Sequence, residues 1–166
     1  MVSFTTLLAF SAASAGALAK PVVQERQIAI PEGWTWHVSA WEAGMTRSGS
    51  YYRFNVTVPR VESETTNIAG VTARCEGREN GWYRKGNWYE NCRIIYGSNN
   101  GVAAKLSERE SDVDGYPREI LISFEYGAYG DRPAYNFTGK APMIYNAAVA
   151  PLQEFDVKPT EVFGVA

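Results

Sequence analysis

Cysteine has the clearest chemistry in this chain, because the sequence contains only Cys75 and Cys92. In an exported chain the two thiols would oxidise to a disulfide, since the secretory route is oxidising and an exposed free thiol is reactive. Closing the loop between them removes about 3 kcal/mol of unfolded-state entropy, so the bond would be structural. Zinc binding is the alternative, but two thiols and the distant His37 leave a four-ligand site incomplete. We therefore predict one disulfide, no metal site and no cofactor.

Two asparagines match the acceptor pattern for N-linked glycans. Asn55 begins the sequence Asn-Val-Thr, and Asn136 begins the sequence Asn-Phe-Thr. Asn55 alternates with Phe54 and Val56, so on a strand its side chain would face away from theirs and toward solvent. We predict that both asparagines are glycosylation sites, and a mass shift on deglycosylation would test this.

Aromatic and basic residues gather in the loop that the two cysteines would close. Exposed aromatic rings beside cations form binding surfaces, because they offer a large contact area and stack with cations or sugar rings. The alternative is that some of these rings cap the open end of a barrel. The candidate binding surface consists of Trp82, Tyr83, Arg84, Trp88 and Tyr89.

No residue pattern indicates catalysis. His37 is the only histidine, and a polar strand face accounts for it. No serine lies in a nucleophile elbow, and no glycine-rich loop could hold a phosphate. The carboxylates of one acidic run do not have the spacing of a calcium-binding hand, so a solvated loop is favoured. Paired carboxylates from distant segments can still meet, which leaves glycoside hydrolysis as an open alternative. The acidic run contains Glu108, Glu110, Asp112 and Asp114.

The N-terminal segment 1–19 has no charged side chain and is rich in small and apolar residues. It ends in Ala17-Leu18-Ala19, in which the two alanines are the small residues that a signal peptidase accepts, although no Lys or Arg precedes the apolar run. A run this short and this rich in Ala, Ser and Gly is a poor membrane span. We predict a signal peptide cleaved after Ala19, and hence a secreted, extracellular protein that has no membrane segment once the signal is removed. Residues 20–33 would form an N-terminal arm, or a pro-segment if Arg26 is a second processing site.

The composition indicates one folded β domain. The 166 residues are 45% hydrophobic and 20% charged, which is enough apolar surface for a core. Aromatic residues make up 13% of the chain and favour strands. The net charge of −2 does not provide the broad basic surface that nucleic-acid binding uses.

Alternation of apolar and polar residues predicts successive strands, each with one buried face. The clearest is 51–58, in which Tyr52, Phe54, Val56 and Val58 share a face and Pro59 ends the strand. Glycine and asparagine at 97–101 predict a hairpin turn before the strand at 102–106. Prolines make regular strands unexpected in the segment 148–166. We predict an all-β fold, an antiparallel meander-like barrel or sandwich with one disulfide over 34–147, and an irregular tail at 148–166. The remaining predicted strands are 34–40, with Trp34, Trp36, Val38 and Ala40 on one side, and 71–75, 88–96 and 120–126.

Between Trp34 and Tyr126 the order of these features resembles the Alternaria major-allergen family of secreted fungal proteins. The resemblance rests on a Trp-His-Val-Ser strand at 36–39, Tyr-Tyr before Phe-Asn-Val at 51–56, and Cys75 followed by Trp-Tyr shortly before Cys92. An Ala-Lys-Leu strand at 104–106 and an acidic stretch follow. The resemblance covers somewhat more than half of the chain.

This resemblance implies a secreted β-barrel that hosts perceive as an elicitor or allergen, that binds plant defence proteins in some members, and that has no established enzymatic activity. The chain lacks the family's second cysteine pair and the further cysteine of its covalent dimers, so no disulfide-linked dimer is expected. The leading prediction is thus a secreted, non-catalytic effector-like β-barrel that binds a host (plant) extracellular protein or a small apolar ligand. The alternatives are a cell-wall carbohydrate-binding module and a small glycoside hydrolase.

Overall fold

The computed structural model describes residues 29–62, 67–81, 86–109, 115–128, 134–147 and 151–165. Within these ranges the chain is built from antiparallel strands, and no helix is present that could serve as a membrane span. The strands are β1 (Trp36–Thr46), β2 (Gly49–Val58), β3 (Val61–Glu62), β4 (Asn67–Ile68), β5 (Val71–Arg78), β6 (Glu90–Asn91), β7 (Arg93–Tyr96), β8 (Asn100–Leu106), β9 (Glu119–Tyr126), β10 (Ala134–Pro142), β11 (Gln153–Val157) and β12 (Pro159–Val165).

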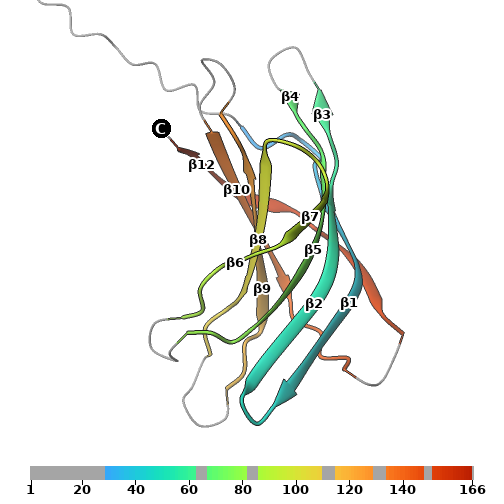
Figure 1. Ribbon diagram of the computed structural model, residues 1–166, viewed down its shortest axis with the longest axis vertical. Helices are drawn as coiled ribbons and strands as arrows, with labels where there is room; N and C mark the ends of the chain where they lie inside the picture. The colour runs from blue at the N-terminus through green and yellow to red at the C-terminus, as the bar shows by residue number, and fades with distance from the viewer. Residues whose placement is uncertain are drawn as a thin grey trace, which may run out of the picture.

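The strands form two packed sheets, so of the two predicted architectures the molecule has the sandwich and not the closed barrel. The first sheet has the order β11-β1-β2-β5-β7, and the second has the order β12-β10-β9-β8-β6. Figure 1 shows them as separate layers, with the small β3–β4 hairpin at one end. The all-β, antiparallel class is confirmed, whereas the barrel is wrong because the outer strands of the two sheets do not pair with one another.

The core lies between the sheets and is rich in aromatic residues. Trp34 and Trp36 contact Phe124 edge to face, with ring centroids 6.0 and 6.2 Å apart. The hydroxyl of Tyr52 crosses the core to donate a hydrogen bond to the carbonyl of Ala104, 2.8 Å away in the second sheet. Burial, and then the charge of Glu90, raise the pKa of Tyr52. The alternation predicted for 51–58 is confirmed, since all its apolar members are buried.

The predicted burial pattern of the first strand is wrong beyond Val38, because the strand contains a β-bulge. The register of β1 with both of its neighbours shifts between Val38 and Glu42, and Ala40 has a φ of 51°. The extra residue reverses the alternation, so Trp41 and not Ala40 takes the next buried position. The indole of Trp41 then donates a 2.8 Å hydrogen bond to the carbonyl of Ile144.

The predicted strand 88–96 is divided between the two sheets. Its first part, β6, pairs with β8, and its second part, β7, pairs with β5. Cys92 lies at the crossing and forms the predicted disulfide with buried Cys75 of β5, across a Cα–Cα distance of 4.4 Å. The reversal at 97–101 uses positive φ at Gly97 and Asn99, as expected. It is not a hairpin, however, because β7 and β8 belong to opposite sheets.

The predicted irregular tail is wrong, because β11 and β12 extend one edge of each sheet. β11 pairs with β1, and β12 pairs with β10. Pro159 is tolerated because it is the first residue of β12, on an edge strand where its missing N–H costs little. The buried Val157 and half-buried Phe155 alternate with exposed carboxylates, a short strand signal that the prolines obscured.

A partly buried ion pair joins the ends of the two sheets. Nε of Arg109 lies 2.5 Å from Oε1 of Glu79, and the second guanidinium nitrogen lies 2.8 Å from Oε2. The backbone N–H of Ser50 also donates to Glu79, and Tyr145 donates to the Ser50 hydroxyl at 3.2 Å. Burial alone would raise the pKa of Glu79, but the hydrogen bonds from Arg109 and Ser50 outweigh burial and hold the pKa below its ordinary 4.5.

Because of this ion pair, the free energy of unfolding depends on pH. The carboxylate of Glu79 stabilises the folded state at neutral pH, and its contribution is lost as the pH falls below 4.5 and through the lower folded-state pKa. We expect Glu79→Gln to lower the free energy of unfolding by about 2 kcal/mol at pH 7 and by less at pH 3. Urea unfolding at both pH values tests this, with Glu76→Gln on the solvent face of β5, the strand that Glu79 follows, as the control. A loss that is equal at both pH values would contradict the assignment.

Candidate functional site

A wide, open groove of about 1200 Å³ runs over the outer face of the second sheet. The register of the strands explains why the face is hollow, because directly paired residues share a face and form rows across the sheet. The central row has short side chains in the middle and longer ones at both edges. In order from β6 to β12, this row is Asn91, Ala103, Ser123, Thr138 and Glu161.

Two further rows complete the floor. On one side of the central row, Gly101 adds to the hollow because it has no side chain. On the other side, Leu121 lies between two lysines and gives the floor a small apolar centre. From β8 to β12 the first of these rows is Gly101, Glu125, Asn136 and Phe163, and from β8 to β10 the second is Lys105, Leu121 and Lys140.

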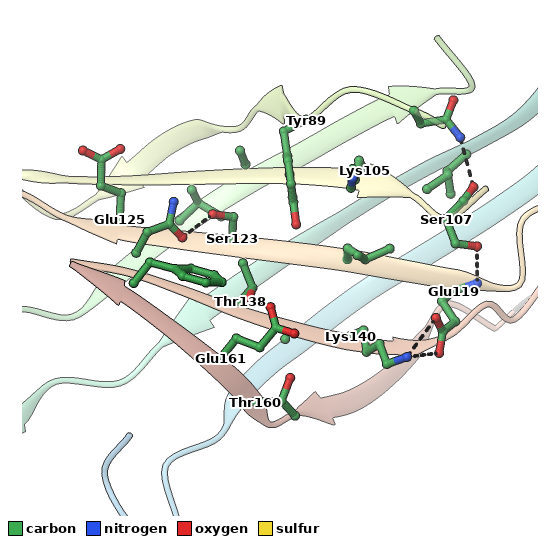
Figure 2. Close-up of a pocket in the computed structure, with 18 of the residues that line it drawn as sticks. Tyr89, Lys105, Ser107, Glu119, Ser123, Glu125, Thr138, Lys140, Thr160 and Glu161 are labelled. Carbon is green, nitrogen blue, oxygen red and sulfur yellow. Dashed lines mark hydrogen bonds and ion pairs between the residues drawn. The ribbon is translucent and has the colours of Figure 1, made fainter. Parts of the chain in front are cut away.

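Aromatic residues stand at opposite edges of the groove. Tyr89, just before β6, is 40% exposed, and Nζ of Lys105 lies 4.8 Å from the centre of its ring. Phe163 of β12, on the other edge, is 54% exposed. Figure 2 shows Tyr89 and Glu161 extending over the sheet from its two sides. Burial, and then the charge of Glu161, raise the pKa of Tyr89.

Hydrogen bonds fix the polar side chains of the floor. The hydroxyl of Ser123 donates to Oδ1 of Asn136 at 2.7 Å, and the hydroxyl of Thr138 donates to Glu161 at 3.1 Å. At one end of the groove, Nζ of Lys140 lies 3.0 Å from Oε1 of Glu119. Figure 2 marks this ion pair with dashed lines. Because these groups are already oriented, a ligand with many hydroxyls could bond to them at little entropic cost.

The candidate binding surface predicted from the sequence overlaps this groove at one described residue. Tyr89 lines it, whereas Trp88, although 66% exposed, does not. Trp82, Tyr83 and Arg84 lie outside the described residues. The floor was missed because it combines single residues from several strands, and only their register brings them together. The one available signal was that two outward-facing positions of β8 carry the small residues Gly101 and Ala103, whereas Val102 between them is buried.

The two predicted glycosylation sites lie on opposite faces of the sandwich. Asn55 faces outward from the first sheet, as its alternation predicted, and accepts a 3.3 Å hydrogen bond from Arg74. Asn136 lies on the floor of the groove in the second sheet. The two sites therefore differ in what an attached glycan would cover.

Among the described residues, those considered for catalysis or metal binding do not converge. His37 lies on the outer face of the first sheet, with Nδ1 3.0 Å from Asp156. Glu108 is on the rim of the groove, and the other three carboxylates of the acidic run lie outside the described residues. In the part of the chain that the structure describes, no three histidine, cysteine or acidic side chains are grouped so that they could hold a metal ion.

No family model, curated protein or solved structure matches the chain. The resemblance to the Alternaria major-allergen family therefore stays a prediction.

Proposed function

We propose that the protein is a secreted, non-catalytic binding protein whose groove on the second sheet takes a carbohydrate chain. The observation that carries this proposal is the groove itself, with its floor of short polar side chains and its aromatic edges at Tyr89 and Phe163. Aromatic faces stack against sugar rings, and fixed amides, hydroxyls and carboxylates match sugar hydroxyls. The groove is open, which suits a chain that extends across several strands.

The same lining argues against the small apolar ligand considered from the sequence. Such ligands favour concave sites in which nearly all of the ligand is covered by apolar side chains. Here the groove is open, and its floor mixes Ser123, Asn136 and Thr138 with apolar Leu121. A small apolar ligand on this floor would therefore stay largely exposed to water. The buried disulfide supports the extracellular setting, because such bonds persist in oxidising compartments.

The groove carboxylates support binding over hydrolysis. The groove is lined by four carboxylates, Glu108, Glu119, Glu125 and Glu161. Two of them are engaged, because Glu119 is paired with Lys140 and Glu161 accepts a hydrogen bond from Thr138. A glycosidase needs one carboxyl group as a proton donor and a second on the other side of the scissile bond. We therefore assign the groove carboxylates to ligand hydrogen bonding and expect no catalytic residue.

A second candidate is the docking of a host extracellular protein, in line with an effector or elicitor. The observation that favours it is the exposure of Trp88, Ile95 and Tyr96, large side chains outside the groove. Aromatic residues of this kind anchor protein interfaces.

Filling the floor of the groove tests the carbohydrate proposal. We expect Ala103→Trp, in protein made without glycans, to abolish binding on an array of plant and fungal cell-wall oligosaccharides, because the indole would occupy the central row. Ser39→Trp places the same bulk on the outer face of the first sheet and should bind as the native protein does. Equal binding by the two variants, or no binding by the native protein, would refute the proposal.

A further inference from the structure

We propose that Asn136 carries an N-linked glycan that lies in the groove, so that the modification closes the site to other carbohydrates. This inference rests on the proposed function only in naming carbohydrates as the ligands that the glycan would keep out of the groove. The placement of the glycan follows from the geometry of the sheet.

Both ends of the acceptor sequence are on the groove floor. Asn136 and Thr138 are on β10, in the interior of the second sheet, and their side chains point out of the same face. Oδ1 of Asn136 accepts the hydrogen bond from Ser123, which orients the amide group. Nδ2, the atom that would carry the sugar, makes no hydrogen bond to any described residue. Attachment there would leave the bond to Ser123 intact.

An aromatic ring is placed to receive the first sugar. Phe163 pairs directly with Asn136 in the register of β12 and β10, and its side chain is 54% exposed. Directly paired side chains lie about 5 Å apart at Cβ, which is within reach of the first sugar ring. A sugar stacked on Phe163 would cover apolar surface that water otherwise contacts.

The rest of the glycan would cover the floor. Gly101 is in the same row as Asn136, two strands away, which is about 10 Å across the sheet. A branched oligosaccharide is longer than this and bulky. Because Asn55 is on the opposite sheet, a glycan on it would leave the groove open. The occupancy of Asn136 alone would thus divide the secreted protein into closed and open forms.

A thiol placed in the floor tests the inference without any ligand. Gly101→Cys fits, because a Cβ at this position meets only Glu125, at 3.9 Å. The variant would be secreted from a eukaryotic host, the glycan at Asn136 established by peptide mass spectrometry, and the rate of reaction with a polyethylene glycol maleimide measured. We expect labelling to be at least severalfold slower before enzymatic deglycosylation than after it.

Ser48→Cys, in the turn between β1 and β2, is the control and should react at the same rate before and after deglycosylation. If Gly101→Cys does not fold, Ala103→Cys in the next row provides the same measurement. An unmodified Asn136 in the secreted protein, or equal labelling rates at Gly101→Cys before and after deglycosylation, would overturn the inference. A failure of the unglycosylated protein to bind oligosaccharides would count against the proposed function instead and would leave the labelling result unchanged.

Discussion

Replacing both cysteines, as Cys75→Ala with Cys92→Ala, is expected to lower the free energy of unfolding by about 3 kcal/mol. The bond closes a loop between residues 17 positions apart, and removing it restores conformational freedom to the unfolded chain. For a domain of this size we expect a fall in Tm of about 6–12 °C. Calorimetry of the native protein and the double variant measures both quantities.

The same variant should lose carbohydrate binding by more than its lower stability explains. β6 pairs with β8 over the short stretch Glu90–Asn91, and the N–H of Cys92 adds one hydrogen bond to the carbonyl of Val102. The disulfide at Cys92 therefore helps to fix the edge of the sheet next to Tyr89. Ile68→Ala is a suitable control, since it removes a buried side chain in β4, away from the groove, at a cost of about 2–5 kcal/mol. Native-like binding by the folded cysteine variant would show that the edge does not depend on the bond.

Tyr89→Ala is expected to weaken carbohydrate binding about thirtyfold, which corresponds to about 2 kcal/mol. The ring forms one edge of the groove, and its loss removes the aromatic surface nearest to Lys105. Isothermal titration calorimetry with the best oligosaccharide from the array measures the effect. Tyr89→Phe separates the ring from the hydroxyl and should retain most of the affinity if stacking dominates.

The matched control for Tyr89 is Tyr96→Ala. Tyr96 is also a tyrosine of the segment 88–96, which passes from one sheet to the other at Cys92. It is 75% exposed and belongs to β7 of the first sheet. Its replacement should leave carbohydrate affinity unchanged. If Tyr96→Ala abolishes binding and Tyr89→Ala does not, the binding surface is the exposed strand β7 and the groove assignment is wrong.

Local alternation was sufficient to predict β2, β5 and β9, because each has one face toward the core and one toward solvent. Alternation was insufficient at Ala40, where the bulge reverses which residues of β1 face the core. It was also insufficient at Cys92, where the chain passes from one sheet to the other. Both features depend on which strands pair in the folded protein, and alternation along one strand does not indicate its partners. The prolines of the tail predict an irregular segment, whereas Pro159 begins the edge strand β12.

The candidate site was harder to predict than the fold. The sequence predicts Tyr89 as part of a binding surface and Asn136 as a glycosylation site. What the sequence did not indicate is that the two residues line one surface. Tyr89 precedes β6 and Asn136 lies on β10, and β8 and β9 lie between these two strands in the second sheet. The hollow arises because small residues of neighbouring strands are in register, and register is set by the whole sheet.

The most direct test of the central claim is a titration of unglycosylated, isotope-labelled protein with the best-binding oligosaccharide, followed by amide chemical shifts. If the groove is the binding site, the largest shifts fall on Ala103, Ser123 and Thr138, and the outer face of the first sheet is unaffected. Shifts confined to β7 or to the first sheet, or no shifts at saturating oligosaccharide, would contradict the assignment.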